Sequence, residues 1–236
     1  MTLNRRSALL AALALPAGCA IQPLAPLLST AIPAPGEPGS LRAPLVGQRW
    51  TYRKLNFFNS SVLDVVQETV ASVAPTIDVD RQADDGAALA DEKHAAWGQL
   101  LRDPAWDYPM TFETPVPLWP ASLVEGAKTS VNTHYRMDGG SIRYWIQVYC
   151  VAHGWERVTV SAGTFDTLRI ERLIRLDHQD HTRAETVRRD TMWLSLEVGR
   201  WVARETSGRY LLPGDNQMWL NHSLEDHFRW DLTAWH

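Results

Sequence analysis

The stretch Ser141–Val151 has the sequence SIRYWIQVYCV, in which every second residue from Ile142 to Cys150 is apolar. A period of two is that of a β-strand with one buried face. The preceding stretch Thr129–Met137 alternates in the same way, and the turn signal Asp138–Gly140 joins the two. Glycines there allow the backbone conformations that tight hairpins need. The sequence therefore predicts a β-hairpin.

The same alternation extends along the chain in both directions. Thr167–His178 alternates except at Arg172, a charged residue on its apolar face, and Arg49–Phe58 and Val62–Ala74 flank a polar turn. Many strands joined by turns predict a mostly β fold: a single antiparallel curved sheet or half-barrel, or a sandwich. Further strands are predicted at Thr76–Gln82, Glu156–Ser161, Glu185–Leu196, Trp201–Glu205 and, as a final strand or pair, Gln217–Leu232.

One segment has a helical composition. Asp84–Leu101 (DDGAALADEKHAAWGQLL) is rich in alanine, leucine and acidic residues, which favour helix. Asp91 could cap its first turn, and Pro104 would end it. We therefore expect one short helix beside the strands.

The N-terminus has the features of an export signal. Arg5 and Arg6 precede the apolar run Ser7–Leu15. Nine helical residues span about 14 Å, against about 30 Å for the hydrocarbon core of a bilayer, so this run predicts a signal peptide and not a membrane span. The paired arginines also resemble a twin-arginine export signal, and the choice between that route and the general secretory route stays open.

The end of this signal carries a cysteine. Leu15–Cys19 (LPAGC) resembles the lipobox of bacterial lipoproteins, with Pro16 at the place where leucine is usual. The resemblance implies cleavage after residue 18, acylation of Cys19 with palmitate, and a periplasmic lipid anchor. Ala20 follows the cysteine where aspartate would mark inner-membrane retention, which favours the outer membrane. An ordinary secretory leader that happens to contain a cysteine is the alternative.

The segment after the cysteine is rich in proline. Residues 20–44 contain six of the 14 prolines, and proline disfavours both helix and central strand. The sequence thus predicts three regions: a lipoprotein signal peptide at 1–18, a proline-rich tether at 19–44 that spaces the domain from the membrane, and a β-rich periplasmic domain at 45–236.

Composition excludes some functions. The formal net charge is −4, so there is no overall basic character of the kind that binds nucleic acid. With Cys19 acylated, Cys150 has no intramolecular disulfide partner. Cys150 lies in phase with the apolar face of its strand, which favours a buried, unreactive thiol.

Three phrases resemble an uncharacterised family of exported bacterial β-rich lipoproteins. They are Val46–Tyr52 (VGQRWTY), Val158–Phe165 (VTVSAGTF) and Trp193–Gly199 (WLSLEVG). The family pattern is V-G-x-x-W-x-Y, then V-T-V-x-A-G-T-F, then W-x-x-x-x-V-G. This resemblance implies an architecture like that of the periplasmic lipoprotein-carrier half-barrels, and it implies no catalytic residues.

Candidate chemistry is sparse. No nucleophile elbow, metalloprotease helix, phosphate loop or dinucleotide fingerprint occurs, so no cofactor is predicted. His178 and His181, with the neighbouring Asp177 and Asp180, could ligate a metal. They fall where a solvated hairpin turn is expected, and that interpretation is favoured.

An aromatic, proline-rich segment could form a lid. Trp106, Tyr108, Phe112 and Trp119 lie in the sequence WDYPMTFETPVPLW. Such a segment could cover an apolar ligand on a concave sheet, or it could simply close the core, which is the favoured interpretation.

These features together predict a non-enzymatic lipoprotein of the cell envelope. It would bind an apolar ligand, such as a lipid, or an envelope protein. Two alternatives stay open: a structural or assembly partner without a ligand, and a metal-dependent hydrolase that uses His178 and His181.

Overall fold

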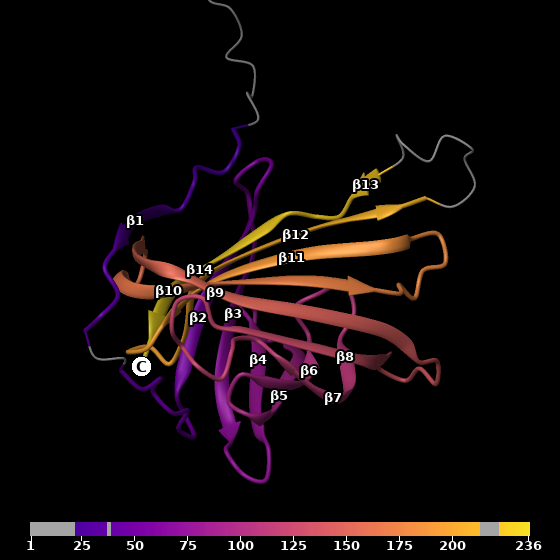
Figure 1. Cartoon of the computed structure of the whole chain (residues 1–236), viewed down its shortest axis with the longest axis horizontal. Coiled ribbons are helices and arrows are strands. Elements are labelled where there is room, and N and C mark those ends of the chain that lie inside the picture. Colours follow the sequence, from indigo (N-terminus) through magenta and orange to yellow (C-terminus); the bar gives the residue numbers. More distant parts are fainter. Residues whose placement is uncertain (1–21, 37–38, 213–221) are drawn as a thin grey trace, which may run out of the picture.

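The computed structural model describes residues 22–36, 39–212 and 222–236. Within these ranges the regular structure consists of strands, with no helix (Figure 1). The strands are β1 (Leu28–Ile32), β2 (Arg49–Asn56), β3 (Val62–Ser72), β4 (Ile77–Ala83), β5 (Ala88–Ala96), β6 (Gln99–Asp103), β7 (Met110–Pro117), β8 (Lys128–Met137), β9 (Tyr144–Val160), β10 (Gly163–Leu176), β11 (Ala184–Ser195), β12 (Arg200–Leu211), β13 (His222–Leu224) and β14 (Phe228–Trp235).

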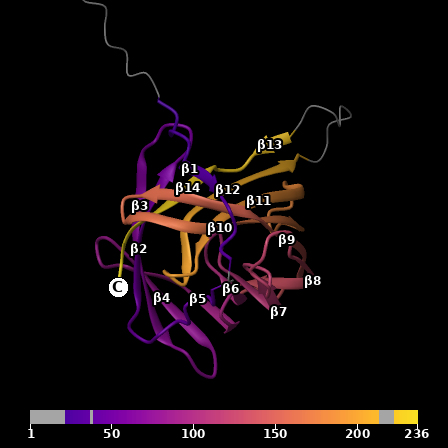
Figure 2. The same cartoon turned by 60° about the vertical axis from the view of Figure 1, so that its left-hand side comes forward.

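Twelve of these strands form a closed antiparallel barrel. Strands β2 to β8 pair in sequence, β8 pairs with β9, and β9 to β12 follow in order. Strand β14 then lies between β12 and β2 and completes the circle. The short strand β1 pairs with the C-terminal part of β9, and the short strand β13 pairs with the C-terminal part of β12 (Figure 2).

The predicted open sheet, half-barrel or sandwich is therefore wrong. Closure comes from β14, in which Leu232 pairs with Tyr52 and Trp235 pairs with Trp50 of β2. These partners are about as far apart in the sequence as the domain allows. Periodicity shows which face of a strand is buried but not which distant strand lies beside it, so the closure was not visible in the sequence.

The predicted helix is also wrong. Residues 84–101 form the turn at Gly86 and the strands β5 and β6. Glu92 and His94 are buried and point into the barrel, so the inward face of β5 carries charged and polar residues. A polar inward face hides the alternation of a strand, and helix-favouring residues in β5 are overridden by its pairing with β4 and β6.

The predicted hairpin of residues 129–151 is confirmed. Strand β8 pairs with β9 from Lys128↔Val151 to Tyr135↔Tyr144. Ile146, Val148 and Cys150 lie in the hydrophobic core. This core lines the barrel interior, together with Trp50, Tyr52 and the inward side chains of the other long strands.

Part of the predicted tether lies on the domain. Leu28–Ile32 forms β1, which pairs with Trp155–Thr159 at the end of β9. Just before it, the Leu24 N–H donates to the Phe57 carbonyl oxygen at 2.9 Å. The signal peptide and Cys19 lie outside the described residues. None of the described residues forms a helix long and apolar enough to cross a membrane.

Candidate functional site

The barrel interior contains a buried ionic cluster centred on Arg200. This side chain extends from β12, and its guanidinium contacts Glu68 Oε2 at 2.7 Å and Glu92 Oε1 at 2.9 Å. His94 lies 2.7 Å from Glu92, and Arg81 lies 3.2 Å from Glu68. The three tryptophan rings that surround the guanidinium of Arg200 are those of Trp50, Trp97 and Trp201.

The charges of this cluster stabilise one another. Burial alone would raise the pKa of Glu92, but Arg200 and His94 hold it well below its usual range. The pKa of Arg200 is raised by the two carboxylates, against the opposing effect of burial. Glu92 and Arg200 are therefore held as ions by opposite charges, which is the condition for stable burial of charge.

A second cluster explains the charged residue in the apolar strand at 167–178. Arg172 is buried, in phase with its apolar neighbours, and donates to Asp190 at 2.7 Å. Arg204 donates to both oxygens of the same carboxylate at 2.8 Å. Arg172 is thus an inward residue of β10 with a partner on β11.

These side chains leave little space in the interior. The enclosed space beside Glu68, Glu92 and Arg204 is about 10 Å³, close to the least that holds one water molecule. Four of the eight residues that line it are charged, namely Glu68, Arg81, Glu92 and Arg204. This part of the described barrel has no room for an acyl chain.

The four aromatic residues of the predicted lid do not gather around one cavity. Trp119 and Phe112 are buried in the core. Trp106 lies over the Arg188 guanidinium, 4.6 Å from it. Tyr108 is half exposed. Two of the four side chains thus fill the core, a third packs against it, and ligand binding by this segment stays a prediction.

His178 and His181 are separated by their surroundings. His178 is buried, with Nε2 3.9 Å from Asp107 Oδ2, whereas His181 is exposed. Donor atoms of His178, Asp107 and Glu225 all lie within 4.8 Å of one another. Sequence analysis missed Asp107 and Glu225 because both come from distant segments without a recognisable motif.

Arginines already pair with the carboxylates of this group. Arg188 donates to both Glu225 oxygens at 2.6 and 2.8 Å, and Arg183 donates to Asp107 at 3.0 Å. Burial, followed by Arg188 and Arg183, lowers the pKa of His178. A divalent cation would meet two positive side chains here, so the geometry favours a structural ion-pair network over a metal centre.

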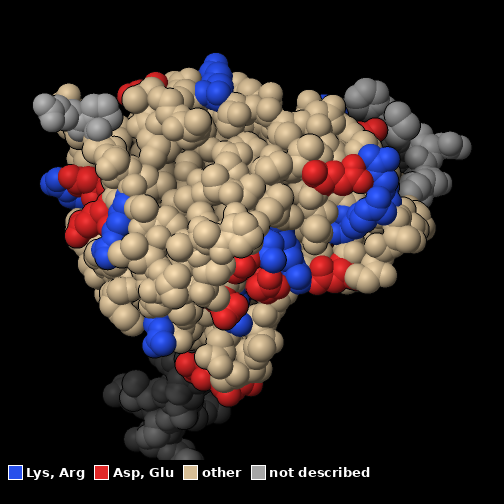
Figure 3. All heavy atoms as spheres, turned by 90° about the horizontal axis from the view of Figure 1, so that it is seen from below, with Lys and Arg blue, Asp and Glu red and all other residues tan. Residues whose placement is uncertain are grey.

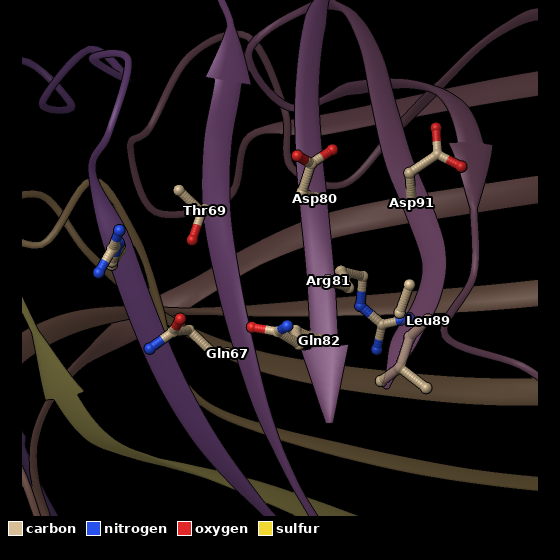
Figure 4. A pocket seen from close by; sticks show the side chains of 9 residues that line it. Gln67, Thr69, Asp80, Arg81, Gln82, Leu89 and Asp91 are labelled. Carbon is tan, nitrogen blue, oxygen red and sulfur yellow. The ribbon is translucent and has the colours of Figure 1, made fainter. Parts of the chain in front are cut away.

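The outer surface of β2 to β5 has a polar groove (Figure 4). Its volume is about 490 Å³. In the register of β3 and β4, Gln67 lies opposite Gln82 and Thr69 lies opposite Asp80. The residues between them, Glu68 and Arg81, alternate to the interior side. The remaining lining comes from Arg49, Ala88, Leu89 and Asp91, and the Arg81 side chain, which pairs with Glu68, also borders the groove.

The groove is suited to hydrogen bonding. Its amides and carboxylates offer donors and acceptors on neighbouring strands, and Arg49 and Arg81 add positive charge. The residues that line it include neither a histidine nor a lysine that could activate the Thr69 hydroxyl. The arrangement supports recognition of a polar partner more than catalysis.

Sequence analysis did not single out the groove. Gln67 and Gln82 lie on strands that were predicted, at positions alternate to the apolar residues. The hollow itself depends on how β2 to β5 curve together. The sequence shows only that polar residues face outward on adjacent predicted strands. This pattern is the same for a groove and for a flat surface exposed to solvent.

Comparison with solved structures shows a related fold. A candidate lipoprotein from Parabacteroides distasonis superposes with a TM-score of 0.54 at 14% identity, over 85% of this chain and 100% of that chain. The two proteins share a fold.

Two further structures are less similar. They are an exported protein with a YmcC-like fold from Bacteroides fragilis (TM-score 0.49, 12% identity, 84% of this chain and 99% of that one) and the hypothetical lipoprotein YmcC from Escherichia coli (TM-score 0.45, 12% identity, 80% and 85%). No protein-family model matches the chain, and no curated protein sequence matches it.

Proposed function

We propose that the chain is a non-enzymatic lipoprotein of the bacterial envelope that binds a protein partner in the groove of β2 to β5. Acylated Cys19 would anchor it on the periplasmic side, and Ala20 favours the outer membrane. The lipobox-like sequence LPAGC supports the anchor. The shared fold with a candidate lipoprotein is consistent with it.

The observation that carries the binding proposal is the contrast between the inside and the outside of the barrel. The interior beside the Arg200 cluster is filled by paired charges, whereas the groove offers unfilled hydrogen-bonding space of about 490 Å³. An apolar ligand would find too little space among those charges. A polypeptide with polar side chains and backbone amides matches the lining of the groove.

The surface charge also favours a protein partner over a polyanion. In the view of Figure 3, acidic and basic side chains lie next to one another, and much of the face carries neither. Mixed charges of this kind can be matched by the surface of one protein partner. They do not produce the strong positive potential that attracts a polyanion.

The anchor is tested by Cys19→Ala. In a Gram-negative host, we expect the wild type to incorporate labelled palmitate and to fractionate with membranes, and we expect the variant to do neither. Cys150→Ala is the matched control and should leave labelling unchanged, because this thiol is buried and burial raises its pKa to about 12. Equal labelling of wild type and Cys19→Ala would contradict the anchor.

The groove is tested by photo-crosslinking followed by affinity measurement. A photoreactive amino acid at Gln82 should capture one envelope protein that the same group at exposed Arg175 on β10 does not. For that purified partner, we expect the double variant Arg49→Ala/Gln82→Ala to raise Kd about tenfold or more, the size of a moderate hot spot. Arg175→Ala is the control. An unchanged Kd in the double variant would reject the groove as the binding site.

A further inference from the structure

The turn between β2 and β3 presents an apolar surface at one end of the barrel. Phe58, Val62 and Leu63 are 50%, 53% and 47% exposed. We call these three side chains and the turn that joins them the β2–β3 tip. Its residues 56–63 (NFFNSSVL) include no charged side chain.

The tip is rigid enough to present these side chains. Phe57 stacks on His227 with ring centroids 3.8 Å apart, which fixes the base of the turn to the barrel. Within the turn, the Phe58 N–H donates to Asn56 Oδ1 at 2.8 Å, and the Ser61 N–H donates to Asn59 Oδ1 at 3.0 Å. The turn thus satisfies much of its own backbone polarity, which lowers the cost of moving it out of water.

The chain that leads to Cys19 starts at this tip. The Leu24 N–H donates to the Phe57 carbonyl oxygen, and the next residue, Ala25, accepts from Arg229 at 2.7 Å. Figures 1 and 2 show the beginning of the described chain beside the β2–β3 turn. Residues 22–32 (QPLAPLLSTAI) also contain no charge.

Covalent geometry then limits the distance to the anchor. Residues 19–24 can span at most roughly 17 Å, whatever their conformation, because an extended chain advances no more than about 3.5 Å per residue. The polar headgroup region on each side of a bilayer is several ångströms thick. An acylated Cys19 therefore keeps Leu24, and with it the β2–β3 tip, close to the membrane surface.

We infer that the β2–β3 tip is a membrane-contacting surface that inserts Phe58, Val62 and Leu63 into the interface of the bilayer that holds the anchor. This inference rests on the acylation of Cys19 in the proposed function. Exposed phenylalanine, valine and leucine on a turn whose own residues 56–63 carry no charge are suited to the boundary between headgroups and acyl chains. With two contacts, the anchor and the tip, the barrel has a fixed orientation on the membrane.

The inference is tested with the full-length acylated protein. The variant Phe58→Cys is labelled with a polarity-sensitive fluorophore and reconstituted into vesicles of phosphatidylethanolamine and phosphatidylglycerol with brominated acyl chains. The native Cys150 is buried and is not expected to label. Bromine on the chains quenches fluorophores that reach the acyl region. We expect a blue-shifted, strongly quenched emission at position 58, and the same at Leu63→Cys.

Val73→Cys is the matched control. Val73 is apolar and 45% exposed, like the tip residues, but follows the other end of β3. Eleven residues of strand place it about 36 Å away. A label there should show solvent-like emission and several-fold less quenching. Far-UV circular dichroism of each variant verifies that the fold is kept.

The outcomes separate the two proposals. If intact mass shows no acyl chain on Cys19, the proposed anchor fails, and the membrane-contacting tip, which rests on it, fails with it. If Cys19 is acylated but position 58 is no more quenched than position 73, the membrane-contacting tip is rejected while the anchor stands. A photoreactive group at position 58 that crosslinks in cells to a second copy of this chain or to another protein, instead of to lipid, would reject it as well.

Discussion

Replacing Arg200 by methionine is expected to lower the free energy of unfolding by about 3–5 kcal/mol, the usual cost of removing one partner from a buried ion pair. Methionine keeps much of the side-chain length and loses the charge. Glu68 and Glu92, both buried, would then face each other without the guanidinium that contacts each at 3 Å or less. Chemical denaturation monitored by tryptophan fluorescence measures the change.

Two further variants show whether charge is the cause. Arg200→Met/Glu92→Gln removes the repulsion between the two carboxylates and leaves Glu68 paired with Arg81 at 3.2 Å. It should recover at least half of the loss, because no buried carboxylate is then without a positive partner. Arg157→Met is the matched control at an exposed pair with Asp166, and it should have a far smaller effect on stability, because solvent screens surface ion pairs. A double variant no more stable than Arg200→Met would show that shape, and not charge, governs this site.

The Arg200 cluster also shows how far the sequence could predict this structure. Most of the predicted strands and the hairpin of residues 129–151 follow from alternation of apolar residues, and the structure confirms them. Residues 156–161, predicted as a separate strand, instead continue β9, and residues 217–221 of the predicted final strand lie outside the described residues. Alternation of apolar and polar residues did not identify the strand where the side chains that face the barrel interior are charged. Glu92 and His94 on β5 point inward, so residues 84–101 resembled a polar helix. A charged residue can be assigned to the interior only when the distant residue that neutralises it is known.

The candidate sites depend on pairings between remote segments. Glu68, Glu92 and Arg200 come from three strands that the closed barrel brings together, and Asp107, His178 and Glu225 come from three loops or strand ends. No local motif links these residues. The groove of β2 to β5 adds a second difficulty, because its residues are ordinary outward positions of predicted strands and its hollow arises from the curvature of the sheet. The lipobox-like sequence at Cys19 could be recognised because it is contiguous in the chain, and the acylation that it implies stays a prediction.

Replacing Gly98 by alanine is expected to destabilise the barrel by about 3–5 kcal/mol, although it adds one methyl group. Gly98 has φ +82°, a left-handed conformation that costs an alanine about 1–2 kcal/mol. Its added Cβ would overlap the Trp119 ring, 2.7 Å from Cζ2 and closer still to Cε2 and Nε1. Trp119 is buried edge-on against Trp97, so it cannot move away without disturbing the core.

The two causes can be separated by comparison. Gly139→Ala has a similar backbone, φ +71°, but a Cβ there meets nothing within 4 Å, so it should cost only the backbone share of about 1–2 kcal/mol. In a Trp119→Phe background, Gly98→Ala should cost clearly less than in the wild type, because the smaller ring leaves room, and a double-mutant cycle measures the difference. An equal loss of unfolding free energy in Gly98→Ala and Gly139→Ala would show that the Trp119 ring moves aside without cost. The expected coupling instead makes the β5–β6 turn and the aromatic residues beneath it one packed unit, which seals the end of the barrel near the Arg200 cluster.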